Sequence, residues 1–200
     1  SQSDRESVLE VSSSMDIGEH PANCLGDIFV FTNADCVNLY KNGEFIKCFR
    51  PDFKNYPNMP HPPVRIDDLI GGQLEEKEGL SKRSSDSIKR AIRDYMNGGG
   101  YKSVLKPKNL AGLAAAVLRD KLSLKRGFDI VLKYVAGWGS DVVIYRFDAI
   151  KNNVVIKSVI KAPAGKVSLE AKADRKLLHE LTTYDVACVN IRAVSEYGNL

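Results

Sequence analysis

Apolar and polar positions follow a strand-like pattern in the stretch 26–49, which contains apolar runs separated by tight turns. Residues 28–31 are β-branched or aromatic, and a second run begins after Asp35. Asn42 and Gly43 separate this second run from a third one. Asn-Gly between apolar runs is the strongest local signal for a β-hairpin, because a type I′ turn requires positive φ at both central residues. The pattern therefore predicts β-structure organised around a hairpin at 42–43.

A helical period begins after a proline-rich connection. Five prolines lie between Arg50 and Pro63, and this density excludes both helix and central strand. In 84–97, 107–122 and 124–135 the apolar residues recur at intervals of three and four, which is the spacing of one helical face. The pattern predicts three helices in succession.

Local signals mark the ends and faces of these helices. Ser84 or Ser85 is expected to cap the first helix and Gly98–Gly100 to end it, while Pro107 suits the first turn of the second helix. We expect the helices to form one small all-α unit. The second helix should contribute the following core face: Leu110, Leu113, Ala114, Val117, Leu118 and Leu122.

Strand-like runs return after the helices. Residues 141–149 and 153–161 are predicted to pair around a turn at Lys151–Asn153, and 167–173 and 184–194 form a further candidate pair. The order strands, helices, strands predicts a mainly β fold with an α insertion, that is, a β-sandwich interrupted by a three-helix unit. The last strand pair stops at a turn, so it is expected to be the beginning of a second, incomplete β domain.

The composition is ordinary for a soluble globular chain, with 44% hydrophobic and 27% charged residues. No apolar run reaches the ~18 residues of a membrane span. The net charge is +4, but segment 80–126 carries +9 from twelve Lys or Arg and three Asp, so the remainder carries −5. We interpret this excess as a solvated helical face. The alternative is a nucleic-acid-binding unit in which Arg90, Arg93 and Arg119 contact phosphates.

The spacing of the cysteines gives information on the cellular compartment of the protein. Cys24, Cys36, Cys48 and Cys188 have neither CxxC nor metal-ligand spacing, so we expect free thiols in a reducing compartment, with a disulfide as the alternative. The first residues contain no basic-then-apolar signal sequence, and the true N-terminus is expected to lie outside this chain. Together these features favour a cytoplasmic location.

Residues suited to catalysis or metal binding do not form a recognisable group. His20, His61 and His179 lack metal-ligand spacing, and no nucleophile or phosphate-loop motif is present. The acids Asp67-Asp68 and Glu75–Glu78 are interpreted as solvated loop charges with a helix-capping role. The sequence therefore predicts no catalytic residue, no metal site and no cofactor in this chain.

Sugar binding is a separate hypothesis, because it needs only an exposed aromatic platform with polar neighbours. Trp138 and Tyr101 are the main substrate-binding candidates, and Tyr134 and Tyr56 are further ones. Trp138 lies between a helix and a strand, so burial where the helices join the sandwich is the alternative for it. Tyr101 follows three glycines that could present it on a loop, although such glycines more often simply end a helix.

A series of motifs, taken in chain order, resembles one protein family. The motifs are Thr32-Asn33-Ala34-Asp35 with Val37, Leu39 and Asn42-Gly43; Met59–Gly71; Trp138-Gly139 with Tyr145–Ile150; Val167–Ala171 with Ala173-Asp174; and Val189–Val194 with Gly198-Asn199. Together they resemble the C-terminal Ig-like accessory region that follows the catalytic barrel in glycoside hydrolase family 2, the β-galactosidase group. The segment Asp67–Trp138 departs from the commonest form and is similar to helical insertions of clostridial-type bacterial members.

The resemblance implies a domain layout. Residues 1–6 would be a linker or an artificial end, and 7–66 together with 139–162 would form an Ig-like β-sandwich. Residues 67–138 would be the helical insertion, and 163–200 a partial second Ig-like domain.

The resemblance also implies a function. The chain would be a non-catalytic accessory fragment whose partner is the catalytic barrel of the same polypeptide, and it would support the barrel, shape the cleft or mediate oligomer contacts. The family's two catalytic glutamates lie on barrel strands, so none is expected here. A carbohydrate-binding module is the alternative, and a nucleic-acid-binding helical unit has less support.

Overall fold

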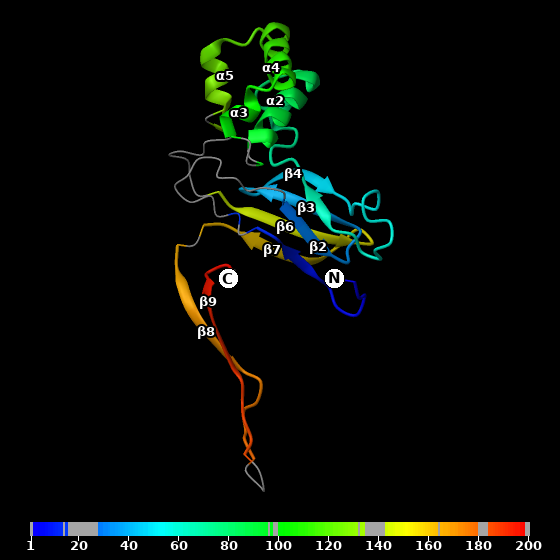
Figure 1. Ribbon diagram of the computed structural model, residues 1–200, viewed down its shortest axis with the longest axis vertical. Helices are drawn as coiled ribbons and strands as arrows, with labels where there is room; N and C mark the ends of the chain where they lie inside the picture. Colours follow the sequence, from blue (N-terminus) through cyan, green and yellow to red (C-terminus); the bar gives the residue numbers. More distant parts are fainter. Residues whose placement is uncertain are drawn as a thin grey trace. The chain divides into compact units, whose positions relative to one another are not determined.

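A computed structural model describes residues 2–13, 15, 28–95, 97, 100–131, 133–134, 143–163, 165–179 and 184–198 of the chain. The chain divides into two compact units, Ser1–Pro163 and Ala164–Leu200, which we call unit 1 and unit 2. Antiparallel sheets make up most of the described secondary structure, and the helices lie between two strands of unit 1 (Figure 1). This confirms the predicted mainly β fold with an α insertion.

Unit 1 contains a three-stranded sheet of order β1-β2-β5 and a four-stranded sheet of order β4-β3-β6-β7. The strands are β1 Leu9–Val11, β2 Ile28–Thr32, β3 Cys36–Lys41, β4 Glu44–Phe49, β5 Val64–Ile66, β6 Tyr145–Lys151 and β7 Val154–Lys161. β3 pairs with β6 along its whole length, from Cys36↔Ile150 to Lys41↔Tyr145. After β4 the chain adds β5 to the three-stranded sheet, builds the helices and returns to the four-stranded sheet as β6, so it leaves and re-enters the sandwich as predicted.

Two tight turns close the hairpins of the four-stranded sheet. The φ angles are 50° and 82° at Asn42 and Gly43, and 51° and 62° at Asn152 and Asn153. Positive φ at both central residues is type I′ geometry, which glycine and asparagine adopt at low cost. Both predicted turns are confirmed. β2, however, belongs to the other sheet, and the chain crosses from one sheet to the other at residues 33–35.

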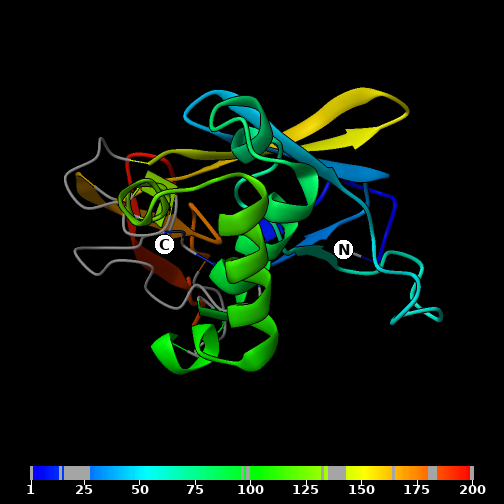
Figure 2. The same ribbon diagram turned by 90° about the horizontal axis from the view of Figure 1, so that it is seen from above.

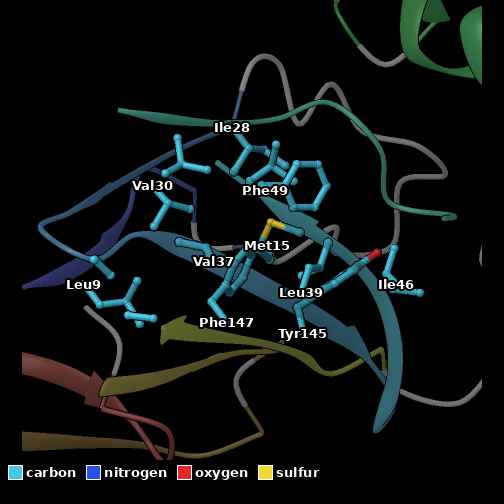
Figure 3. Close-up of a cluster of buried hydrophobic side chains, with 14 residues drawn as sticks. Leu9, Met15, Ile28, Val30, Val37, Leu39, Ile46, Phe49, Tyr145 and Phe147 are labelled. Atoms are coloured by element: carbon cyan, nitrogen blue, oxygen red, sulfur yellow. The ribbon is translucent and has the colours of Figure 1, made fainter. Parts of the chain in front are cut away.

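The two sheets face each other across a hydrophobic core (Figure 3). The core includes Leu9, Ile28, Val30, Val64 and Ile66 from the three-stranded sheet, and Val37, Leu39, Ile46, Phe49, Tyr145, Phe147 and Ala149 from the four-stranded sheet. The side chain of Met15 is also buried and lies in the middle of this cluster in Figure 3. Burial stabilises such a core by about 25 cal/mol per Å² of apolar surface. Unit 1 is thus built on a β-sandwich.

Between β5 and β6 the described residues form five helices: α1 Gln73–Glu76, α2 Lys82–Asp94, α3 Gly100–Val104, α4 Pro107–Arg119 and α5 Leu124–Val131. The three predicted helices are confirmed as α2, α4 and α5, whereas α1 and α3 were not predicted. The predicted cap of α2 is wrong, because Ser84 and Ser85 are buried inside the helix and Ser81 occupies the N-cap position. α2 ends at Asp94 and is followed by π-helical residues at Tyr95 and Asn97, whereas Gly98 and Gly99, the predicted end signal, lie outside the described residues.

The helices share a second hydrophobic cluster, formed by Ile70, Leu74, Leu80, Ile88, Ile92, Leu122 and Ile130. The predicted core face of α4 is wrong in most of its members. Leu110, Val117 and Leu118 are exposed, whereas the buried residues of α4 are Asn109 and Ala116. α4 packs against α2 through the side that carries Asn109, Gly112 and Ala116. Gly112 lies there against the side chain of Ser87.

Unit 2 consists of one antiparallel strand pair, β8 (Val167–Ala173) and β9 (Val189–Ser195). β8 has the predicted bounds, while β9 begins later than the predicted run 184–194. Alternation places Val167, Leu169 and Ile191 on one face of the pair, and all three are exposed. The extension of this pair into a second Ig-like domain stays a prediction.

Candidate functional site at the sheet–helix junction

One short segment after β5 anchors the helices on the sandwich. Leu69 packs against the sandwich core, and the next residue, Ile70, belongs to the helical cluster. Two adjacent residues are therefore held in two different close-packed cores, which restricts rotation of the helices against the sheets. We call the surrounding residues the junction: Glu44, Ile46, Lys47, Asp67, Asp68, Gly71, Gln73, Lys77, Lys89 and Arg93.

Gly71 brings the junction backbone against β4. Its φ of 61° lies in the left-handed region, and a Cβ atom at this position would overlap the carbonyl oxygen of Ile46. Glycine satisfies both conditions because it has no side chain. Lys89 of α2 donates a hydrogen bond from Nζ to the Gly71 carbonyl, which ties α2 to the same turn.

Asp68 organises the turn that precedes Gly71. Its Oδ1 accepts hydrogen bonds from the backbone N–H groups of Ile70 (3.0 Å) and Gly71 (2.8 Å), and Lys89 and Lys47 place Nζ 3.5 and 3.9 Å from Oδ2. Burial alone would raise the pKa of this carboxyl group. The backbone hydrogen bonds and the two cations outweigh burial, so the pKa lies below its usual value of 3.8. Asp68 is therefore ionised at neutral pH although only 14% of its side chain is exposed.

Further ion pairs surround this centre. Glu44 on β4 accepts a hydrogen bond from Gln73 Nε2 (2.8 Å) and pairs with Lys77. Asp67 pairs with Arg93 of α2 at 3.3 Å. Because these groups are exposed, each pair contributes little to stability by itself. Together they orient α1 and α2 over the end of β4.

Acids that the sequence analysis interpreted as solvated loop charges have structural partners, so that interpretation is wrong for them. Asp68 is mostly buried, and Glu78 accepts hydrogen bonds from Lys133 Nζ (2.7 Å) and the Tyr134 hydroxyl (3.1 Å). Glu75 and Glu76 lie in α1 rather than in a loop. In the described part of the chain, no group of three His, Cys, Asp or Glu side chains could hold a metal ion. The junction is thus suited to positioning helices, since its carboxylates are engaged by cations and backbone N–H groups.

The aromatic residues predicted to bind sugar differ in where they lie and in how exposed they are. Trp138 lies outside the described residues, and so does the side chain of Tyr101, whose backbone belongs to α3. Tyr134 is half-buried, and burial together with its hydrogen bond to the Glu78 carboxylate raises its pKa. Its ring is therefore not an open platform. Tyr56 is exposed in the proline-rich connection.

A row of aromatic and charged side chains, which sequence reasoning missed, crosses the outer face of the four-stranded sheet. The Tyr40 and Phe45 rings meet edge to face with 5.6 Å between centroids, and Cζ of Arg146 lies 4.1 Å from the Tyr40 ring centroid. Arg146 Nε lies 3.2 Å from Oδ1 of the buried Asp148, which also accepts a hydrogen bond from Ser158 Oγ (2.7 Å). We call these five residues the aromatic row.

The basic segment 80–126 has several contacts within the protein. Arg93 pairs with Asp67, and Arg119 donates to Ser84 Oγ at 3.2 Å. Two of the three arginines that the nucleic-acid hypothesis assigned to phosphates are therefore engaged by protein groups. None of the helices in the described residues has the length and apolar character that crossing a membrane requires.

The described cysteines Cys36, Cys48 and Cys188 are free thiols, and Cys24 lies outside the described residues. Cys36 is buried at the start of β3. Burial and the neighbouring Cys48 thiol raise the pKa of Cys36 to about 11. Because the thiolate is the reactive form, this thiol is poorly suited to act as a nucleophile at neutral pH.

The close approach at Gly71 predicts the cost of adding one methyl group. Gly71→Ala is expected to lower the free energy of unfolding by about 3 kcal/mol, because both the left-handed backbone and the overlap with Ile46 oppose it. Gly79 is the matched control, since its φ is 66° but a Cβ there meets nothing within 4 Å. Gly79→Ala should cost only about 1 kcal/mol. Urea unfolding, monitored by circular dichroism, gives the free energy of unfolding of both variants. Equal losses in the two variants would contradict the close approach of Gly71 to Ile46.

The lowered pKa of Asp68 predicts a pH-dependent contribution to stability. Asp68→Asn keeps the acceptor oxygen but removes the charge, and is expected to cost about 1–2 kcal/mol at pH 7. A carboxyl group with a depressed folded-state pKa stabilises above its unfolded value, and the contribution disappears as the pH falls through the folded-state value. The difference between wild type and variant should therefore be constant from pH 7 to pH 5 and shrink below 3.8.

The control for this measurement is Asp67→Asn, because the Asp67 side chain is 40% exposed. It should cost no more than about 0.5 kcal/mol. Urea unfolding at several pH values gives both curves. A difference for Asp68→Asn that persists unchanged at pH 3 would contradict the role assigned to its charge.

Comparisons with known proteins do not assign the chain to a family. No protein-family model matches it. A search of curated proteins also gives no match. The likeness to glycoside hydrolase family 2 therefore rests on the sequence motifs alone. In the structure Thr32 and Asn33 are buried at the end of β2, and Asn42-Gly43 forms the type I′ turn.

Proposed function

We propose that the chain is a non-catalytic accessory region of a glycoside hydrolase family 2 enzyme of the β-galactosidase type. In this role the sandwich packs on the catalytic barrel of the same polypeptide and holds the helical unit in a fixed position. The region would support the barrel, shape its substrate cleft or mediate contacts between subunits. The observation that carries the proposal is the set of hydrogen bonds made by the motif Thr32-Asn33.

The motif clamps the chain that enters the sandwich. Thr32 Oγ1 donates to the carbonyl of Val8 (2.7 Å), and Asn33 Oδ1 accepts from the N–H of the same residue (3.0 Å). Asn33 Nδ2 also donates to the carbonyls of Ser3 (2.8 Å) and Glu6 (2.7 Å). Because Thr32 and Asn33 are buried, losing these bonds would leave polar groups unsatisfied. Such a clamp would fix the direction in which the sandwich continues from a preceding barrel.

The junction supports the same role from the other side of the sandwich. It attaches the helices through two cores, a backbone contact at Gly71 and a largely buried carboxylate. A rigid attachment of this kind suits a unit that must be presented at a defined place, for example at the rim of a cleft. The engaged state of the Asp68 carboxylate also favours a structural over a catalytic role.

This proposal predicts what the gene encodes and what the isolated chain does. The coding sequence before Ser1 is expected to specify a (β/α)8 barrel with two glutamates whose carboxyl groups lie about 5 Å apart. The purified chain should not hydrolyse a chromogenic aryl β-galactoside above the buffer blank, whereas the longer product should. Turnover by the isolated chain, or an unrelated domain encoded upstream, would refute the proposal.

The aromatic row favours a second candidate function, carbohydrate binding. Phe45 is 55% exposed and lies beside Tyr40 on the open face of the four-stranded sheet. Arg146 and Ser158 supply hydrogen-bonding groups on the same face. An exposed ring flanked by polar groups is the arrangement that stacks on the apolar side of a sugar ring.

The second candidate is tested by comparing two phenylalanines of equal exposure. If the row binds glycans, Phe45→Ala should weaken binding on a glycan array at least tenfold. Phe53→Ala should leave it unchanged, because Phe53 is 56% exposed but lies in the proline-rich connection. If the wild-type chain binds no glycan, or if both variants lose affinity equally, the hypothesis that this surface binds carbohydrate is wrong.

A further inference from the structure

The most apolar side of α4 is exposed in the part of the chain that the structure describes. All thirteen residues of this helix are described, and its buried residues are Asn109 and Ala116. The opposite side carries the exposed residues Pro107, Leu110, Ala111, Ala114, Val117 and Leu118. These recur at three- and four-residue intervals, so they lie on one side of the helix and none of them is charged. We call this set the α4 stripe.

The α4 stripe is the kind of surface that soluble proteins use for interaction. Leu118 is 81% exposed, and the preceding Leu105 adds a further exposed leucine near the start of the helix. Single exposed leucines are common, but a continuous apolar row along a helix is not. In Figure 2, which looks down on the helical unit, the helices of residues 100–119 lie toward the viewer. An apolar stripe on an outer helix indicates that another apolar surface covers it.

Charges beside the stripe identify the chemistry of that partner. Lys106 and Lys108 are exposed at the start of α4, and Lys121 is exposed just after its end, next to Arg119, which also donates to Ser84 Oγ. The acid in this region, Asp120, is partly exposed, and its Oδ2 accepts hydrogen bonds from the N–H (3.1 Å) and the Oγ (3.2 Å) of Ser81. Both ends of the stripe are therefore basic.

The basic ends argue against a second copy of this chain as the partner. An α4–α4 contact would bring cations against cations in both the parallel and the antiparallel orientation. Like charges juxtaposed in this way disfavour an interface. A partner with acidic residues beside its apolar face would instead be complementary.

The shape of the stripe favours a helix over a lipid surface. Ala111 and Ala114 are small, while Leu110, Val117 and Leu118 are large, so the stripe has a shallow middle between bulky side chains. Small side chains let a second helix approach closely, whereas membrane-surface helices present bulky apolar side chains along their buried face. The opposite side of α4 is also held against α2, so the helix cannot sink into a bilayer alone.

We propose that the α4 stripe is a docking site for an amphipathic α-helix whose apolar face is bordered by acidic side chains. The partner helix lies along α4 with its leucines between Leu110, Val117 and Leu118, and its carboxylates reach the exposed lysines at both ends, Lys106 and Lys108 at one end and Lys121 at the other. This is the helix-on-apolar-surface mode of recognition, in which anchors recur at helical spacing. The proposal stands independently of the glycosidase assignment, because it uses only α4 and its neighbours.

The test uses a fluorescein-labelled helical peptide of about three heptads, with leucine and alanine along one face and glutamate beside it. A control peptide carries lysine in place of every glutamate. Fluorescence anisotropy is expected to show micromolar binding of the acidic peptide that weakens between about 50 and 300 mM salt. The lysine peptide should bind at least tenfold more weakly. Equal binding of both peptides, or no binding of the acidic one, would overturn the proposal.

Variants locate the binding on the α4 stripe. Leu118→Glu should weaken binding at least tenfold without altering the circular dichroism spectrum, because the side chain is already exposed. Leu169→Glu makes the same change at a residue that is 78% exposed on β8, and should bind as wild type does. The double variant Lys106→Glu, Lys108→Glu should lose the acidic peptide and gain the lysine peptide. Unchanged binding in Leu118→Glu would overturn the assignment of the site.

Two further measurements test the other possible binding partners of the α4 stripe, a second copy of the chain and a lipid surface. Sedimentation velocity reports whether the chain self-associates, and flotation with vesicles containing anionic phospholipid reports lipid binding. Under the proposal, the chain is monomeric at micromolar concentration and does not float with the vesicles. Self-association or vesicle binding that Leu118→Glu abolishes would replace the helical partner by a second copy or a membrane, and would overturn the proposal.

Discussion

Two neighbouring side chains, Leu69 and Ile70, tie the sheets and helices of unit 1 together, because the partly buried Leu69 packs against the sandwich core and the buried Ile70 belongs to the helical cluster. The backbone that follows them can turn tightly against β4 only because residue 71 has no side chain. The carboxylate of Asp68 compensates for this tight turn, since it accepts the N–H groups that the turn would otherwise leave unpaired. These residues therefore determine how the chain passes from β5 into α1 and α2.

The junction therefore differs from the other surfaces of unit 1, because its side chains are used in contacts within the protein. The junction engages its acids and its three lysines in ion pairs, so these charges have partners within the protein. Among the described residues, the outer face of the four-stranded sheet and the outer side of α4 remain exposed. Two exposed surfaces are compatible with the proposed accessory role, for which the clamp formed by Thr32 and Asn33 would add a defined direction of entry.

Elements with strong local signals could be predicted from the sequence. The Asn42-Gly43 turn, the Asn152-Asn153 turn, β8 and the start of α4 at Pro107 all depend on the conformational preferences of a few adjacent residues. The short helices α1 and α3 could not be found in this way. A helix of four or five residues is too short for a periodic signal, and its stability comes from packing rather than from its own sequence.

The sequence by itself determined the kinds of element and their order, because these follow from local periodicity and turn chemistry. The tertiary structure decided which side of each element faces a core. α4 shows the difference, since its most apolar side was predicted to be buried, yet α2 is packed against the side of Asn109 and Ala116. The aromatic row also depends on the tertiary structure. Tyr40 and Arg146 come into contact only because β3 pairs with β6, which follows the helical insertion in the sequence. Periodicity identifies an apolar face, but only packing shows whether the protein covers that face or leaves it for a partner.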